Sequence, residues 1–218
     1  MRYDFNLPYL LSYSPVDVEA FAIFFVAMLT AVLVSAEGQA FAATLLGDSR
    51  PDAKDRLHFN VFLHLSIPGT INFFVAGFAW SKQMSIDVTR FQSNPGLRLI
   101  LSRLAGPFAN FIMANIAASL NWILGRYSVQ DEVFSTIVIV NVTMAVYNLI
   151  IFPPLPGFAL LEAIFPDSVF FERVKRLLVN FGPYLIVAFF LVVRLSGWDG
   201  VAKLFNPVVL YVTNLIMT

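Results

Sequence analysis

Long apolar runs constrain this chain more than any other feature. The run from Phe21 to Ser35 is almost entirely apolar, and it continues to Leu46 with one charged residue, Glu37. About 20 consecutive apolar residues are enough for a helix to span a bilayer. Hydrophobic residues make up 58% of the 218 residues and charged residues only 13%, which excludes an ordinary soluble domain. We therefore expect an integral, multi-pass membrane protein that contacts the lipid bilayer.

Charge and residue counts narrow the classes of partner and metal site. The 14 Lys and Arg residues balance the 14 Asp and Glu residues, so no electrostatic argument supports binding to nucleic acid. No Cys is present, which excludes disulfides and thiolate metal sites. His58 and His64 are the only imidazoles. Any nitrogen-ligated metal site must use one or both of them.

The apolar pattern predicts an all-α polytopic bundle that forms a single membrane domain over residues 1–218. Small residues at Ala109, Ala114, Ala117 and Ala118 predict a close helix neighbour for the second long helix. The expected elements are a helix at 17–46 after the start signal Ser14-Pro15, helices at 97–124, 133–152 and 184–195, interfacial segments at 158–165 and 168–178, and a last segment at 201–217 broken at Asn206-Pro207.

Two further segments are not expected to be regular helices. Residues 61–80 are apolar but contain Pro68 and Gly69, which predicts a broken or re-entrant segment shielded by protein. Residues 48–59 alternate charge signs, beginning with Asp48 and Arg50, and are expected to form a solvated loop at the membrane edge. Residues 81–96 are polar and predict a second loop.

Five separated stretches occur in a distinctive order. The first, at residues 36–48, begins Ala-Glu-Gly-Gln-Ala and ends Gly-Asp, and the second, at 56–70, contains Arg-Leu-His-Phe-Asn and His-Leu-Ser-Ile-Pro-Gly-Thr. The third, at 80–95, begins Trp-Ser-Lys and ends Asn-Pro, and the fourth, at 104–110, reads Leu-Ala-Gly-Pro-Phe-Ala-Asn. The fifth, at 148–157, runs from Asn to Pro-Leu-Pro-Gly. Together they resemble the site-2 protease family of intramembrane zinc metalloproteases. The resemblance implies that family's transmembrane bundle, a post-helix strand near 56–60, and a family-like core at about 17–157 followed by C-terminal helices at 158–218.

The departures from the family pattern fall on its chemistry. In the family, a His-Glu-x-x-His helix supplies two zinc ligands and a Glu that activates the zinc-bound water, and a later Asp supplies the third ligand. Here Ala36 and Ala40 stand at the two His positions, and Pro156 stands at the Asp position. None of these side chains has a donor atom, whereas a catalytic zinc needs about three protein ligands. The resemblance therefore implies a pseudoprotease without zinc or any other cofactor, in which Glu37 is vestigial and no catalytic residue is functional.

An alternative origin and an alternative metal site are also open. Deliberate inactivation would replace His by Ala, but Pro156 restricts φ and is a poor replacement for Asp in a turn, which favours natural loss. His58 and His64 could rebuild a site with Glu37 and restore metalloprotease activity. Since they lie six residues apart beyond a loop, we expect them instead to be hydrogen-bonded structural residues and expect no metal.

Three functions remain open at this point. The first is a binding module that holds other integral membrane proteins without cutting them, with a groove formed by Pro68, Gly69, Asn148, Gly157 and Glu37. The second is a fixed subunit of an oligomer or hetero-complex, which the apolar surface and residues 201–217 would dock. The third is an intramembrane zinc metalloprotease with a non-standard metal site. For Glu37 we expect a hydrogen bond to a backbone group, or to Gln39 or Asn148.

Overall fold

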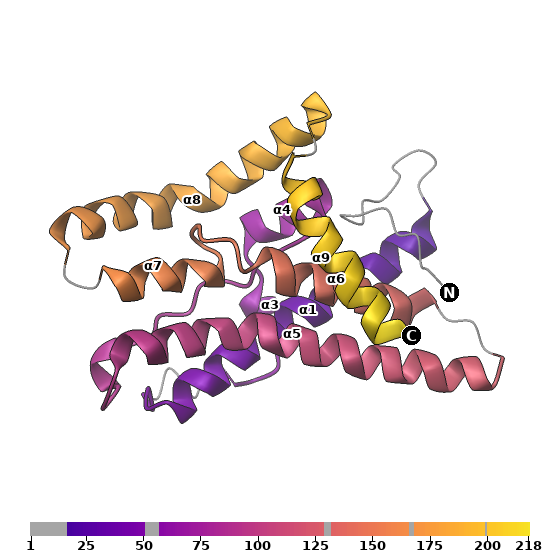
Figure 1. Cartoon of the computed structure of the whole chain (residues 1–218), viewed down its shortest axis with the longest axis horizontal. Helices are drawn as coiled ribbons and strands as arrows, with labels where there is room; N and C mark the ends of the chain where they lie inside the picture. Colours follow the sequence, from indigo (N-terminus) through magenta and orange to yellow (C-terminus); the bar gives the residue numbers. More distant parts are fainter. Residues whose placement is uncertain (1–16, 51–56, 129–131, 166–167, 199) are drawn as a thin grey trace.

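The computed structural model describes residues 17–50, 57–128, 132–165, 168–198 and 200–218. Within these ranges the chain is helical, and its β pairing is a single isolated bridge between Leu65 and Ser81. The elements are α1 Val18–Leu45, α3 Val61–His64, α4 Ile67–Ala76, η1 Val88–Arg90, α5 Pro95–Arg126, α6 Glu132–Tyr147, η2 Pro156–Phe158, α7 Ala159–Ile164, α8 Val169–Ser196 and α9 Gly200–Met217 (Figure 1). The predicted all-α class is confirmed. The Ser14-Pro15 start signal and the charges at 52–56 lie outside the described residues.

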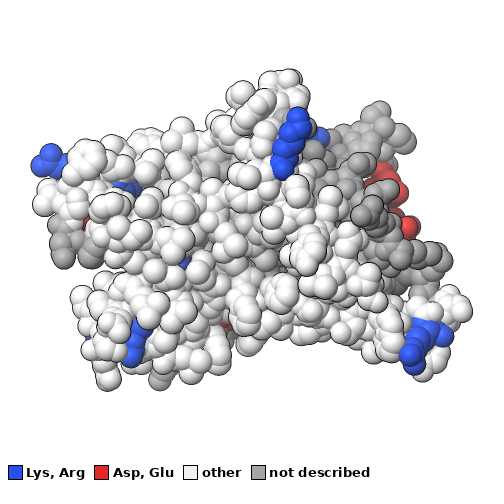
Figure 2. All heavy atoms as spheres, in the orientation of Figure 1, with Lys and Arg blue, Asp and Glu red and all other residues white. Residues whose placement is uncertain are grey.

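Four helices give the chain its membrane character. By length and composition, α1, α5, α8 and α9 are each able to cross a membrane. The face in Figure 2 is mostly uncharged, with Lys and Arg confined to a few separate places. An uncharged apolar exterior is what the hydrocarbon core requires of a protein surface. The chain is a multi-pass integral membrane protein, as its composition predicts.

α1 and α5 pack closely enough for their backbones to touch. The Asp17 side chain caps α1 by accepting hydrogen bonds from the backbone N–H groups of residues 19 and 20. A Cβ atom built on Gly38 would lie 2.7 Å from the Ala109 Cβ, and one built on Gly106 would lie 2.7 Å from the Ser35 Oγ. Ala114 and Ala117 on α5 are also fully buried. The predicted close helix neighbour of α5 is therefore α1.

α6 differs from the expected span at 133–152. It ends at Tyr147, and its 16 residues put it below the length of the four spanning helices. Most of its residues from Thr136 to Val142 are buried, which makes it a core helix surrounded by protein rather than a lipid-facing span. The apolar residues after Tyr147 form turns because the following prolines cannot continue a helix.

The C-terminal half contains longer helices than the sequence predicts. α8 runs unbroken through Gly182 and Pro183, where an interfacial segment and a separate span were expected, and α9 runs unbroken through Pro207. Gly182 allows α8 to approach the turn after α6, because a Cβ there would clash with the Pro153 carbonyl oxygen. Asn206 accepts a hydrogen bond from the Tyr147 hydroxyl at 2.8 Å, which fixes α9 against α6. These tertiary contacts support both helices in the region of their prolines.

Arg194, near the end of α8, binds the backbone of another helix. Its Nη1 donates hydrogen bonds to the carbonyl oxygens of Phe74 at 2.9 Å and Val75 at 3.2 Å. These carbonyls belong to the last turn of α4, where backbone acceptors lack helical partners and a cation is favoured by the helix dipole. Arg194 therefore caps α4 from another helix.

The broken segment is confirmed, but its break lies before the proline. α3 and α4 are separated at Leu65 and Ser66, which are extended, and Ser66 then caps α4 through its side chain. Pro68 and Gly69 lie in the first turn of α4, where a missing N–H costs little. A Cβ on Gly69 would lie 2.6 Å from the Trp80 carbonyl oxygen. Gly69 therefore lets the loop around Trp80 pass directly over α4.

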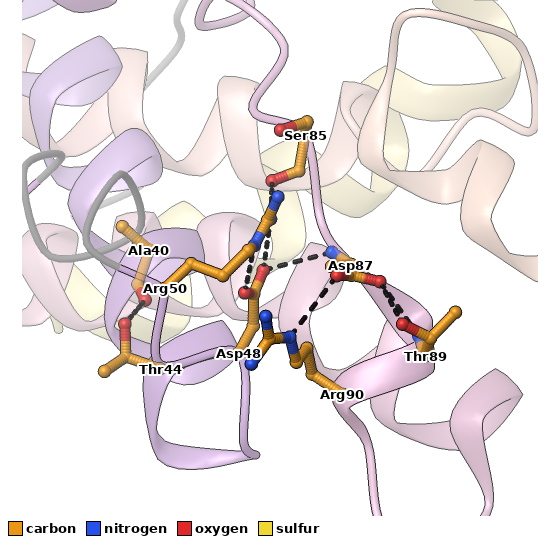
Figure 3. A network of polar contacts seen from close by, with 8 residues as sticks. All are labelled: Ala40, Thr44, Asp48, Arg50, Ser85, Asp87, Thr89 and Arg90. Carbon is orange, nitrogen blue, oxygen red and sulfur yellow. Dashed lines mark hydrogen bonds and ion pairs between the residues drawn. The ribbon is translucent and has the colours of Figure 1, made fainter.

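The loop after α1 is anchored rather than simply solvated. Asp48 is fully buried and accepts hydrogen bonds from Arg50 Nε at 2.6 Å and Nη2 at 2.7 Å, and from the Asp87 backbone N–H at 3.1 Å (Figure 3). Arg50 also donates to the Ser85 carbonyl. The Thr89 hydroxyl donates to Asp87 and holds the pKa of that carboxyl below its ordinary value. This network ties residues 82–90 to the end of α1.

Candidate functional site

The family-like stretch of α1 lies at the centre of the molecule, but its metal-ligand positions are apolar. Ala36 is 5% exposed and Ala40 is fully buried, and the structure gives neither a polar atom beyond its backbone. Pro156, at the start of η2, lines a small cavity together with Ser35 and Gln39 of α1. The three positions therefore gather around the same part of α1 without providing a side-chain donor.

Asn148 points an unused amide into this cavity. It follows α6, is fully buried, and lines the cavity with Gln39 and Gln83. Among the described residues, neither the Oδ1 nor the Nδ2 atom of Asn148 has a hydrogen-bond partner. The cavity measures about 10 Å³, which is close to the minimum for one water molecule. A buried amide without a partner costs about 1–3 kcal/mol, so such a group is unusual and is often functional.

Glu37 is bonded to the segment before α3, not to Gln39 or Asn148. Its Oε1 accepts a hydrogen bond from the Phe59 backbone N–H at 2.9 Å and lies 3.0 Å from His64 Nε2. Its Oε2 is buried and has no partner among the described residues. The predicted bond to a backbone group is thus confirmed, while the predicted side-chain neighbours are wrong. The carboxylate still has one oxygen available.

Glu37 and both histidines lie together. Their candidate ligand atoms are all within 4.8 Å of one another, and the rings of His58 and His64 stack with centroids 4.9 Å apart. A turn between the histidines produces this arrangement, since Phe59 has φ of 53° and Asn60 caps α3, which ends at His64. A non-glycine residue in the left-handed region costs roughly 1–2 kcal/mol. His64 is hydrogen-bonded, as the sequence predicts, but it clusters with Glu37, which the sequence does not predict.

An irregular segment borders the same cavities. Residues 82–87 follow the bridge at Ser81 without forming helix or turn, and Lys82 N–H donates to the His64 carbonyl at 2.7 Å. Among the described residues, no hydrogen-bond partner is found for the backbone N–H groups of Gln83 and Met84. Met84 lines a second cavity, of about 20 Å³, together with Ala36. The pattern of the sequence gave no signal for this edge, since the loop is simply polar.

The backbone N–H groups of the predicted groove residues Gly69 and Gly157 are occupied. Gly69 N–H donates to the Ser66 hydroxyl at 3.3 Å, and Gly157 N–H donates to the Asn148 carbonyl at 2.9 Å. Pro68 has no N–H to offer. The open backbone donors of this region therefore lie at Gln83 and Met84 instead. The segment that carries them is linked to the turn after α6 by the Gln83 side chain, which donates to the Pro154 carbonyl at 3.3 Å.

Arg103 on α5 also reaches this region. Its Nη1 donates to the Gln39 side-chain oxygen at 3.4 Å, and both residues line the cavity that contains Asn148. The contact with Gln39 places a cation beside the polar cavity.

Comparison with known proteins gives one relative. The chain is 29% identical over 185 residues to "Putative zinc metalloprotease YwhC" of Bacillus subtilis, which covers 78% of this chain and 84% of the relative. This similarity supports a metalloprotease-like family. No protein-family profile and no solved structure matches the chain.

The zinc that such a family implies does not fit at the family positions of this chain. A tetrahedral zinc is bound by Cys, His, Asp or Glu side chains. The methyl groups of Ala36 and Ala40 and the ring of Pro156 supply none of these, and the cavities beside them are too small for more than a water molecule. No hydrolytic step can be derived through a metal at these three positions.

Proposed function

We propose that this protein is a degenerate, non-hydrolytic member of the site-2 protease family that captures a segment of another integral membrane protein. The observation that carries the proposal is an open backbone edge beside an unpaired buried amide. The open donor at this edge is the Met84 backbone N–H, and the amide is that of Asn148. The captured segment would be a transmembrane helix whose end has unwound into an extended strand.

The edge is suited to pairing with a strand. An extended segment with free N–H groups can add a further strand, and the main-chain hydrogen bonds then supply affinity without requiring a particular sequence. The network of Asp48 and Arg50 holds this segment in place before a partner arrives, which lowers the ordering cost of binding.

The Asn148 side chain also supports capture of a strand. A backbone peptide group has one donor and one acceptor, and the Asn148 amide offers the complementary pair. The link between Gln83 and the Pro154 carbonyl keeps the turn that follows Asn148 close to the open edge. A strand added at Met84 would therefore pass near a side chain able to bond it a second time.

The chemistry of the site supports capture without cleavage. Ala36, Ala40 and Pro156 cannot hold the metal that would acidify a water molecule. Glu37 accepts a hydrogen bond from the Phe59 N–H and contacts His64, so the one carboxylate retained from the family pattern is already engaged. A base without an activated water or a nucleophile has no reaction to assist.

The proposal is tested with a synthetic peptide of about 20 apolar residues that contains a central Gly-rich stretch, because such a stretch unwinds readily. The peptide carries a fluorophore and is titrated into the full chain in lipid nanodiscs. We expect saturable binding, and we expect Met84→Pro to weaken it because proline removes the N–H without disturbing an extended backbone.

Met84→Ala is the matched control, since it removes the side chain and keeps the N–H. Equal affinity for Met84→Pro and Met84→Ala would refute strand addition at this edge. A stoichiometric complex that co-purifies through the apolar outer surface, with no effect of either variant, would favour the fixed-subunit function instead.

A further inference from the structure

The cluster formed by Glu37, His58 and His64 has a feature that the proposed function does not use. Glu37 has a side chain that is only 8% exposed, and its Oε2 has no hydrogen-bond partner among the described residues. His64 is similarly covered, with a side chain 10% exposed, whereas His58 is exposed. The cluster therefore consists of two buried side chains, Glu37 and His64, and one exposed side chain, His58.

These three side chains are a ligand set for a divalent transition metal. Two imidazoles and one carboxylate are the protein ligands of many three-ligand zinc sites, and imidazole also suits copper and nickel. Ligand atoms bonded to zinc at about 2.0–2.2 Å in tetrahedral geometry lie roughly 3.3–3.6 Å apart. The candidate atoms here lie within 4.8 Å, and the His64–Glu37 pair is already at 3.0 Å.

His58 must move to bring its ring nitrogen closer to the other two ligand atoms, and its exposed position allows this. Its ring is exposed, and its Nδ1 accepts only a long hydrogen bond of 3.4 Å from the Asn60 backbone N–H. Bringing the three ligand atoms to bonding distances requires this ring to rotate out of its stack on His64.

We propose that Glu37, His58 and His64 form a metal site for a zinc-like divalent cation, displaced from the positions the family uses. At this site Glu37 is a ligand. The ion joins α1 to the segment Leu57–His64 and so fixes the position of the His64 carbonyl, which accepts the hydrogen bond from Lys82 at the start of the open edge. The site is structural for that edge, and it does not depend on capture of a partner.

The inference is tested by metal binding to the full chain, purified in detergent with an affinity tag that contains no histidine. Co²⁺ and Zn²⁺ are added after treatment with a chelator. We expect one ion per chain and the visible absorption of Co²⁺ held by nitrogen and oxygen ligands, which Zn²⁺ displaces. Loss of an outer-shell partner alone lowers metal affinity roughly 10–100-fold, so His58→Ala should lower it at least about 100-fold.

Glu172→Gln on α8 is the control, since it removes a carboxylate that is paired with Lys175 outside the cluster. Glu37→Gln and His64→Gln change buried groups, so His58→Ala, at an exposed position, keeps the test valid if they fail to fold. No ion bound by the wild-type chain would overturn the site. So would an affinity that His58→Ala and Glu172→Gln leave equally unchanged, because the ion would then be adventitious.

Discussion

Replacing Asn148 by Leu should stabilise the protein while weakening capture. Both polar atoms of this fully buried amide lack partners among the described residues. Leaving a buried polar group unpaired costs about 1–3 kcal/mol, and Leu of similar volume removes that cost. If imperfect repacking takes back about 1 kcal/mol, the expected net gain is roughly 0–2 kcal/mol. A gain of 1 kcal/mol corresponds to a rise of about 2–4 °C in Tm for a chain of this size.

The effect on capture has the opposite sign. If the amide donates one hydrogen bond to the captured strand and accepts one from it, two bonds of about 0.5–1.5 kcal/mol each are lost. A loss of about 1–3 kcal/mol lowers the affinity roughly 5- to 150-fold. Tm is measured by near-UV circular dichroism in detergent, and affinity by the peptide titration in nanodiscs.

Asn72→Leu is the matched comparison. Asn72 is equally buried, but its Nδ2 donates to the Phe78 carbonyl at 2.8 Å, so its removal leaves a buried acceptor unpaired and should lower stability by about 1–3 kcal/mol. If Asn148→Leu also lowers stability by this amount, its amide is satisfied in the folded protein and serves structure. If capture is unchanged, Asn148 has no part in it.

Two further changes test the packing that positions the site. Asp48→Asn removes the charge that pairs with Arg50. Breaking a buried ion pair costs about 3–5 kcal/mol, and here we expect roughly 2–3 kcal/mol because the Arg50 side chain is 21% exposed. Unchanged stability in chemical unfolding would contradict the anchoring role. Gly38→Ala brings a Cβ within 2.7 Å of Ala109 and should cost about 1–3 kcal/mol. Gly125→Ala, where nothing lies within 4 Å, should be neutral or stabilise by up to about 1 kcal/mol. A similar Tm for the two variants would argue against close packing of α1 on α5.

Local sequence signals predict those elements whose stability is local. The apolar run with Asp17 before it predicts α1, and the small residues of α5, such as Ala109 and Ala114, predict a close neighbour. The turn after α6 follows from its prolines. Prolines alone do not predict helix ends, however, since α8 and α9 continue through Pro183 and Pro207 where packing supports them.

The candidate site could be predicted only in part. The resemblance of the sequence to the site-2 protease pattern points to positions 36, 40 and 156, where Ala36, Ala40 and Pro156 have no donor side chains. The approach of His58 and His64 to Glu37 depends on the left-handed turn at Phe59 and on packing across 21 or more residues, for which the sequence pattern carries no signal. The open edge at Met84 is likewise invisible, because a polar loop does not reveal which of its backbone groups lack partners.

The fate of the captured peptide distinguishes capture from cleavage. The wild-type chain in nanodiscs is saturated with the fluorescent peptide, with Zn²⁺ or with a chelator, and bound peptide is recovered and weighed by intact mass spectrometry. We predict that the peptide is bound under both conditions and recovered uncut. Fragments that form with Zn²⁺ and are absent with the chelator would contradict the account and identify the protein as a working metalloprotease.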